Sequence, residues 1–222
     1  MERDRRTFKQ ATANMNFIKK MGYIWYHYKM HIIAVAVLLT VGTYFAVQII
    51  TSKTTMLNVK FVANGMSNAN IDKLKNNAES QLLKNRNKQD FSFGILPEQN
   101  ADSPSITGSQ ELWVPMMAGD VDILVAPKGG LEPFATGGRL VDLSSIPGLT
   151  DDAASNGVKL VNYKVDGSND AEKPYGIDMN SIGVTDKLGF SNGNMMIGIV
   201  NGGGNMDMAV NFLKWLMKQK TL

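Results

Sequence analysis

Residues 119–130 read GDVDILVAPKGG, and this stretch decides the fold of the part of the chain in which it lies. Residues 121–126 are apolar apart from Asp122, and a proline and two glycines follow within the next four positions. A short apolar run that ends in turn-forming residues is typical of a strand buried on both faces, as in parallel sheets. We therefore expect this strand at the centre of a mostly parallel sheet.

Strands and helices alternate on both sides of this stretch. Hydrophobic patterns predict further strands at residues 56–63, 91–96, 139–143, 175–179 and 195–200. They predict helices at residues 70–87, 131–136 and 207–218, and a short helix or an irregular bridge at residues 111–119. Residues 64–65 predict a turn, residues 97–108 a loop, and residues 158–163 either a helix or a strand. This order predicts one α/β domain with a mostly parallel sheet and room for an antiparallel edge.

A second decisive stretch precedes this domain. Residues 32–50 read IIAVAVLLTVGTYFAVQII, without a charge or a proline, and are long enough as a helix to cross a hydrocarbon core of roughly 30 Å. Aromatic residues flank it, as at a membrane interface. A buried helix of a soluble protein rarely stays uncharged for so long, and a cleaved signal peptide usually has a shorter apolar run. We therefore expect an uncleaved signal-anchor helix at residues 30–51.

Charge predicts the orientation of this helix. Residues 1–31 contain seven Lys and Arg and two Asp and Glu, whereas the remainder of the chain carries a net charge of −2. Basic residues gather on the cytoplasmic side, so residues 1–29 are predicted to lie inside the cell and residues 56–222 outside, after a tether at residues 52–55. Residues 1–22 fit either an amphipathic helix on the inner leaflet or an extension of the membrane helix. The expected partner is the lipid bilayer of a bacterial cell, and we expect no nucleic-acid partner.

Composition argues against an enzyme. The chain has no cysteine, and its two histidines, His27 and His31, lie before the apolar stretch. The outer domain therefore lacks the residues for Ser-His-Asp or Cys-His catalysis and for His or Cys zinc sites. Residues 166–170 resemble the start of a calcium loop, but Ala171 and Ile177 stand where glycine and glutamate are required. We expect no catalytic residue, cofactor or metal; a two-carboxylate glycosidase is the one enzymatic alternative.

Three segments carry a family resemblance. Residues 120–143 combine the buried strand, a short helix with Leu131, Phe134 and Ala135, and GRLVDL at residues 138–143. Residues 173–180 read KPYGIDMN, and residues 197–216 form a strand, a glycine-rich turn and a helix. Together they resemble the extracellular solute-binding proteins of ABC transporters. Members of that family usually have two lobes and around twice this length, so the resemblance implies a truncated, single-lobe, membrane-anchored version.

The resemblance implies two functions. The first is an accessory or sensing subunit of a membrane complex, with other membrane subunits of an ABC transporter as partners. The second is direct capture of a small solute, such as a saccharide, a peptide or an anion, at the strand ends. In open α/β sheets, ligands lie beyond the carboxyl ends of the strands.

Two glycine-rich turns are candidate binding sites. Residues 127–130 and 201–205 each lead into a predicted helix, whose N-terminal N–H groups favour anions. The candidate contacts are Lys128, Gly129, Gly130, Gly202 and Gly203. The alternative is that these glycines only form strand-to-helix turns.

Polar and aromatic residues supply further candidates. The family resemblance adds Tyr175, Asp178 and Asn180 as ligand contacts, with an edge-strand role as the alternative. Asp120 and Asp122 are predicted on one side of a strand, either as a cation or hydroxyl site or as a solvated pair. We expect three aromatic residues to be core rather than a sugar-stacking platform: Trp113, Phe134 and Trp215.

Overall fold

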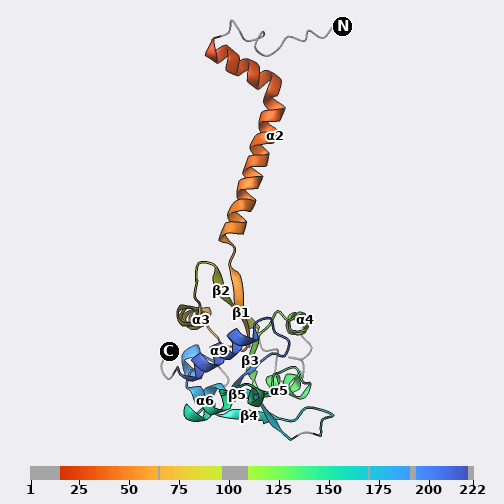
Figure 1. Cartoon of the computed structure of the whole chain (residues 1–222), viewed down its shortest axis with the longest axis vertical. Helices are drawn as coiled ribbons and strands as arrows, with labels where there is room; N and C mark the ends of the chain where they lie inside the picture. Colours follow the sequence, from red (N-terminus) through yellow and green to blue (C-terminus); the bar gives the residue numbers. More distant parts are fainter. Residues whose placement is uncertain (1–15, 65, 97–109, 170, 191–193, 220–222) are drawn as a thin grey trace. The chain divides into compact units, whose positions relative to one another are not determined.

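The computed structural model describes residues 16–64, 66–96, 110–169, 171–190 and 194–219, and Figure 1 shows the chain. The chain divides into two compact units, with the boundary between Ser52 and Lys53. The first unit contains one long helix, and the second contains a sheet with its helices. The expectations for residues 1–15, for Gly65 and for the loop at residues 97–108 lie outside the described residues.

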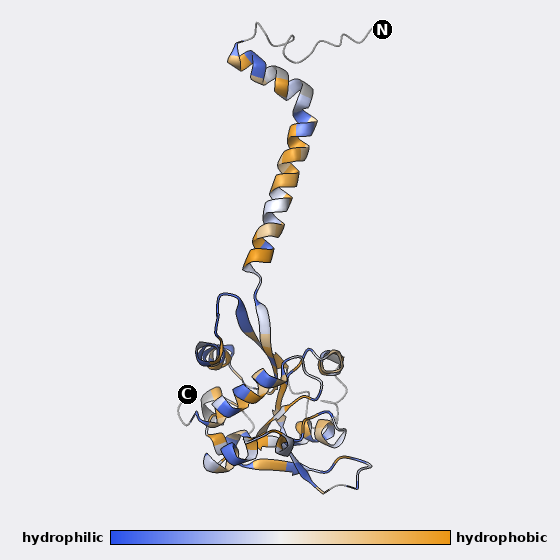
Figure 2. Cartoon of the chain, viewed as in Figure 1, coloured by the Kyte–Doolittle hydropathy of each residue, from blue (hydrophilic) through white to orange (hydrophobic). Residues whose placement is uncertain are grey.

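The first unit contains α2 (Phe17–Thr51), a helix of 35 residues. Its part Tyr28–Thr51 is long and apolar enough to cross a membrane, and Figure 2 colours most of it hydrophobic. The hydroxyls of Thr40 and Thr43 donate to main-chain carbonyls one turn earlier, at 2.9 and 2.7 Å. These polar groups are therefore satisfied without water. α2 also extends through residues 17–29 of the predicted basic segment.

The second unit is built on a six-stranded sheet with the order β2-β1-β3-β6-β5-β4. β1 pairs in parallel with β2 and β3, whereas β6 is antiparallel to both β3 and β5, and β4 is antiparallel to β5. Four of the six described strands therefore share one direction. The strands are β1 (Thr54–Val62), β2 (Gln89–Leu96), β3 (Ile123–Pro127), β4 (Leu160–Tyr163), β5 (Lys173–Asp178) and β6 (Met195–Ile199).

The predicted α/β fold is confirmed, but the antiparallel part is larger than one edge. β6 runs against its neighbours although it lies inside the sheet. Between β5 and β6, the part of the chain that the structure describes contains two helices of four residues each, α7 (Met179–Ile182) and α8 (Thr185–Leu188). A parallel neighbour needs a crossover that returns the chain along the whole sheet, and such short helices do not supply one.

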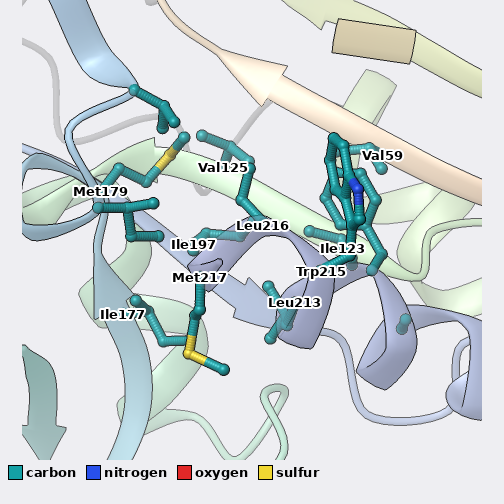
Figure 3. Close-up of a cluster of buried hydrophobic side chains, with 14 of the residues drawn as sticks. Val59, Ile123, Val125, Ile177, Met179, Ile197, Leu213, Trp215, Leu216 and Met217 are labelled. Atoms are coloured by element: carbon teal, nitrogen blue, oxygen red, sulfur yellow. The ribbon is translucent and has the colours of Figure 1, made fainter. Parts of the chain in front are cut away.

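Helices cover both faces of the sheet. On one face, side chains of β1 cluster with α3 (Asn68–Leu82), α6 (Leu149–Ser155) and α9 (Met206–Met217), and Figure 3 shows part of this core. On the other face the cluster includes α4 (Gln110–Ala118) and α5 (Lys128–Thr136). Ile123 and Val125 of β3 belong to the first cluster, Leu124 and Ala126 to the second, and all four are fully buried. The central strand is therefore confirmed.

Most predicted elements agree with the structure, and residues 158–163 prove to contain a strand, β4. β1 begins at Thr54, so the tether shortens to Ser52 and Lys53. The strand predicted at residues 139–143 is wrong, because only Leu140 forms a bridge, to Val200. Asp142 then caps the 3-10 helix η1 (Leu143–Ser145) by accepting from the N–H of Ser144 at 2.9 Å. The short helices α6, α7 and α8 lie where no helix is predicted, since four to seven residues show no clear period.

Candidate functional site

The first candidate turn, at the end of β3, is already helical. α5 begins at Lys128, whose N–H donates to the carbonyl of Asn194 at 3.0 Å. Gly129 is exposed, and a Cβ built there would meet no atom within 4 Å, whereas Gly130 is buried. The two glycines therefore lie in the first turn of a helix rather than in the loop before it. Ligand binding by these residues stays a prediction.

The second candidate turn, after β6, closes around an internal carboxylate. Asp122 is 5% exposed, and its two oxygens accept from the N–H groups of Asn58 at 2.7 Å and Asn205 at 2.8 Å. A Cβ on Gly203 would lie 3.0 Å from the Cα and Oδ1 atoms of Asp122, so the close approach of this loop requires glycine. Gly202 has a φ of 87°, which also favours glycine. An aspartate of the protein thus accepts an N–H group of this turn, and ligand binding by Gly202 and Gly203 stays a prediction.

Asp120 and Asp122 do not form the predicted pair on a strand. β3 begins at Ile123, so both residues precede it. Asp120 is exposed, and its carbonyl accepts from the side-chain amide of Asn58. Asp122 is instead buried beneath the loop after β6. The two carboxylates therefore have different surroundings, and Asp122 has a structural role.

The two candidate turns lie at opposite edges of the sheet. In the β3–β6 register, Ile123 is paired with Ile199 and Pro127 with Met195. The start of α5 therefore follows one end of β3, while the loop at residues 201–205 lies beside the other end. The length of β3 separates these ends by roughly 13 Å. Each turn follows the carboxyl end of its own strand, as predicted, but the reversed direction of β6 carries the second turn to the opposite side of the sheet.

The candidates on β5 are engaged within the domain. Tyr175 is 8% exposed and belongs to the second hydrophobic cluster. The carboxylate of Asp178 caps α7 by accepting the N–H of Asn180 at 2.9 Å. Asn180 is exposed, at the same edge of the sheet as Lys128, because Asp178 is level with Met196 and Met196 with Ala126. These contacts account for the residues structurally, and their role with a ligand stays a prediction.

The aromatic residues are core, as expected. Phe134 is fully buried, and Trp215 is 8% exposed, with its indole N–H donating to the side-chain oxygen of Gln81 at 3.0 Å. The ring of Trp113 is half-buried and packs at 5.0 Å from that of Phe134. Trp113 also lines a hollow of about 90 Å³ that includes Gly202. No shared aromatic platform follows from these positions.

Two polar hollows lie away from most of the predicted contacts, one along β1 and β2 and the other beside α3 and the loop that follows it. One of about 530 Å³ includes Asn58 and Lys60 of β1 and Ser92 of β2, together with Asp120 and the residues 204–205. The other, of about 630 Å³, is lined by polar residues only: Lys53, Asp72, Lys75, Asn76, Glu79, Arg86, Asn87 and Asp90. The sequence did carry a signal for the first hollow. Polar residues that alternate with buried ones mark a strand face that is left open.

Two titratable groups in the domain have shifted pKa values. Burial, together with the charge of Glu132, raises the pKa of Tyr163 to about 12, and its hydroxyl lies 3.5 Å from the carbonyl of Lys128. Burial also works to raise the pKa of Asp142, but hydrogen bonds from Ser144 and the charge of Lys173, 3.5 Å away, outweigh it and lower that pKa. Both shifts move the pKa further from 7, so neither group is suited to exchange a proton near neutral pH.

Among the residues that the structure describes, no group of three or more His, Cys, Asp or Glu could hold a metal ion.

Comparisons with known proteins add little to this geometry. No protein-family model and no curated protein matches the sequence. Among solved structures, a substrate binding domain of a putative molybdenum ABC transporter from Clostridium difficile is similar, with 13% identity and a TM-score of 0.36, covering 75% of this chain and 93% of that chain. A TM-score at this level establishes no common fold.

Proposed function

We propose that this chain is a membrane-anchored, solute-binding-like domain that serves as an accessory or sensing subunit of a membrane complex, an ABC transporter. Its N-terminus lies in the cytoplasm and its α/β domain outside the cell. Support comes from the apolar part of α2, from the α/β lobe that follows it, and from the sequence resemblance at residues 120–143, 173–180 and 197–216.

One observation favours a subunit over a receptor that acts alone. The predicted contacts are divided between two edges of the sheet, and two of the polar groups near them are already used internally. Asp122 accepts two main-chain N–H groups, and Asp178 caps a helix. A single lobe that keeps its strand-end groups for its own folding is better suited to packing in an assembly than to enclosing a solute.

Native mass spectrometry tests this proposal. The full-length chain, carrying a C-terminal tag, is purified from its own membranes in a mild detergent. We expect a complex of fixed stoichiometry that contains a subunit with many membrane spans. A matched chain, in which residues 28–51 are replaced by an unrelated membrane helix, separates contacts of the outer domain from contacts of α2. Recovery of the full-length chain without such a subunit, under several mild detergents, contradicts the proposal.

Direct capture of a solute is the second candidate, and the hollow of about 530 Å³ beside Asn58 and Lys60 favours it. Its polar lining suits a saccharide, a peptide or an anion. A ligand that binds only the folded chain stabilises it by RT ln(1 + [L]/Kd), so melting temperature should rise with ligand concentration. The variant Lys60→Gln should weaken that response. An unchanged melting temperature across libraries of all three classes counts against capture.

A further inference from the structure

Positive charge is concentrated where the chain enters the second unit. Residues 53–90 contain seven Lys and Arg and three Asp and Glu, a net charge of +4, whereas residues 91–222 contain nine and fifteen, a net charge of −6. Four exposed cations of the first segment form what we call the basic edge: Lys53, Lys84, Arg86 and Lys88. The domain is therefore strongly polarised along its sequence.

Hydrogen bonds place the basic edge beside the start of β1. The N–H of Thr54 donates to the carbonyl of Lys88 at 2.8 Å, and Thr54 is in register with Gln89 of β2. The loop at residues 83–88 joins α3 to β2 and runs alongside the first residues of β1 in Figure 1. Figure 2 colours this loop hydrophilic. Three of the four cations thus come from one loop that is fixed against the first strand.

Three acidic side chains line the hollow beside Lys53 and Arg86; Asp72 is exposed, and the other two are engaged within the protein. Glu79 is 7% exposed and accepts the N–H of Phe91 at 3.0 Å, with the guanidinium of Arg86 at 3.9 Å. Asp90 accepts from the hydroxyl of Thr55 at 3.2 Å. The three lysines of the basic edge form no ion pair with any other residue that the structure describes. Their charge is therefore available to an external anion.

Chain length limits how far the basic edge can be from a membrane that α2 crosses. Only Ser52 and Lys53 separate Thr51, the last residue of α2, from Thr54. Three residues span at most about 11 Å, so the backbone at Lys88 lies within roughly 14 Å of the end of the helix. A headgroup layer is roughly 5–8 Å thick, and an exposed charge acts over roughly 8–10 Å. The basic edge is therefore within electrostatic range of lipid headgroups.

We propose that the basic edge binds anionic phospholipid headgroups of the membrane that α2 crosses, and so holds the second unit against that surface in one orientation. This inference rests on the proposed function, because it requires α2 to span the membrane. Each cation near an anionic surface favours the bound state roughly fivefold. The net negative charge of residues 91–222 disfavours the opposite orientation, since like charges repel.

The test uses the full-length chain in nanodiscs and a single fluorescent label. The chain has no natural cysteine, so Asn85→Cys labels the loop of the basic edge and Ser155→Cys labels the end of α6. Energy transfer to a headgroup-labelled lipid is compared between phosphatidylglycerol-rich and pure phosphatidylcholine nanodiscs. One variant neutralises the basic edge, with Lys53, Lys84, Arg86 and Lys88 changed to Gln. A matched variant changes three lysines and one arginine elsewhere to Gln: Lys159, Lys164, Lys218 and Arg139.

We expect higher transfer from position 85 in anionic nanodiscs than in neutral ones, and a lower value after salt is raised from about 0.05 to about 0.5 M. The measured ratio compares chains whose second unit is held against the membrane with chains whose second unit is not. Neutralising the basic edge should lower this ratio at least tenfold, and the matched variant should leave it within about twofold. If energy transfer depends on neither lipid charge nor salt in a chain shown to be inserted, the inference is overturned, whereas the proposed function is not. A chain that fails to insert through α2 instead overturns the proposed function.

Discussion

Carboxylates at single positions hold the turns of this domain together. Asp122 joins the start of β3 to the loop after β6, and Asp142 and Asp178 each cap a short helix. Glu79 accepts a main-chain N–H of the edge strand β2. Acidic residues beside glycine-rich turns attract attention as ligand contacts, but main-chain N–H groups at turns need acceptors as well.

Replacing Asp122 by Asn should lower the free energy of unfolding by about 1–3 kcal/mol, because the amide can accept only one of the two N–H groups and leaves the other unpaired. Denaturant unfolding of the full-length chain in detergent, followed by tryptophan fluorescence, measures this loss. Asp120→Asn is the matched control, since Asp120 is exposed and its stability change should be near zero. Equal effects of the two substitutions would contradict a structural role specific to Asp122.

Tyr163 should make the domain sensitive to alkaline pH. Its pKa is raised from 10.0 to about 12, so the folded state keeps the phenol proton more tightly than the unfolded state. This stability is fully present below pH 10 and is lost as pH rises towards 12, by up to about 2–3 kcal/mol. Unfolding midpoints of wild type and Tyr163→Phe, measured from pH 9 upwards, should therefore diverge. Parallel curves would contradict a contribution of Tyr163 to the loss of stability at alkaline pH.

At the scale of elements, the apolar patterns predicted the central strand, the first two strands and the amphipathic helix α9, because burial on one or both faces leaves a clear period. The direction of β6 was not predictable, since the apolar pattern of a buried strand does not depend on whether it runs parallel or antiparallel to its neighbours. That one reversal places the turn at Gly203 at the edge of the sheet opposite to Lys128. The separation of the two candidate turns therefore arises from topology, and ligand binding at either turn stays a prediction.

The two glycine turns should respond differently to a methyl group. Gly203→Ala should lower the free energy of unfolding by about 1–3 kcal/mol, because its Cβ would lie 3.0 Å from Asp122. Gly129→Ala should leave stability unchanged or raise it by up to about 1 kcal/mol, since the position is helical and open. Both are measured by denaturant unfolding. A stable Gly203→Ala variant would show that the loop after β6 does not close on Asp122 as described.

At the scale of the whole molecule, the sequence combines an apolar span, a basic entry segment and an acidic remainder. The span and the charge asymmetry can be recognised in the sequence without a structure. The basic edge could not be recognised in the sequence, because it depends on the hydrogen bond between Thr54, at the start of β1, and Lys88, in the loop before β2. The proposed subunit role and the proposed membrane contact both require the α/β domain to lie outside a membrane crossed by α2.

Cysteine labelling in intact cells tests that requirement most directly, because the natural chain has no cysteine. Two variants are compared, Asn16→Cys just before α2 and Ser155→Cys at the end of α6, both at exposed positions. We predict that a membrane-impermeant maleimide labels residue 155 in intact cells and residue 16 only after permeabilisation, with the chain retained in the membrane fraction. Labelling of residue 16 but not residue 155 in intact cells, or release of the α/β domain into the medium, would contradict the account.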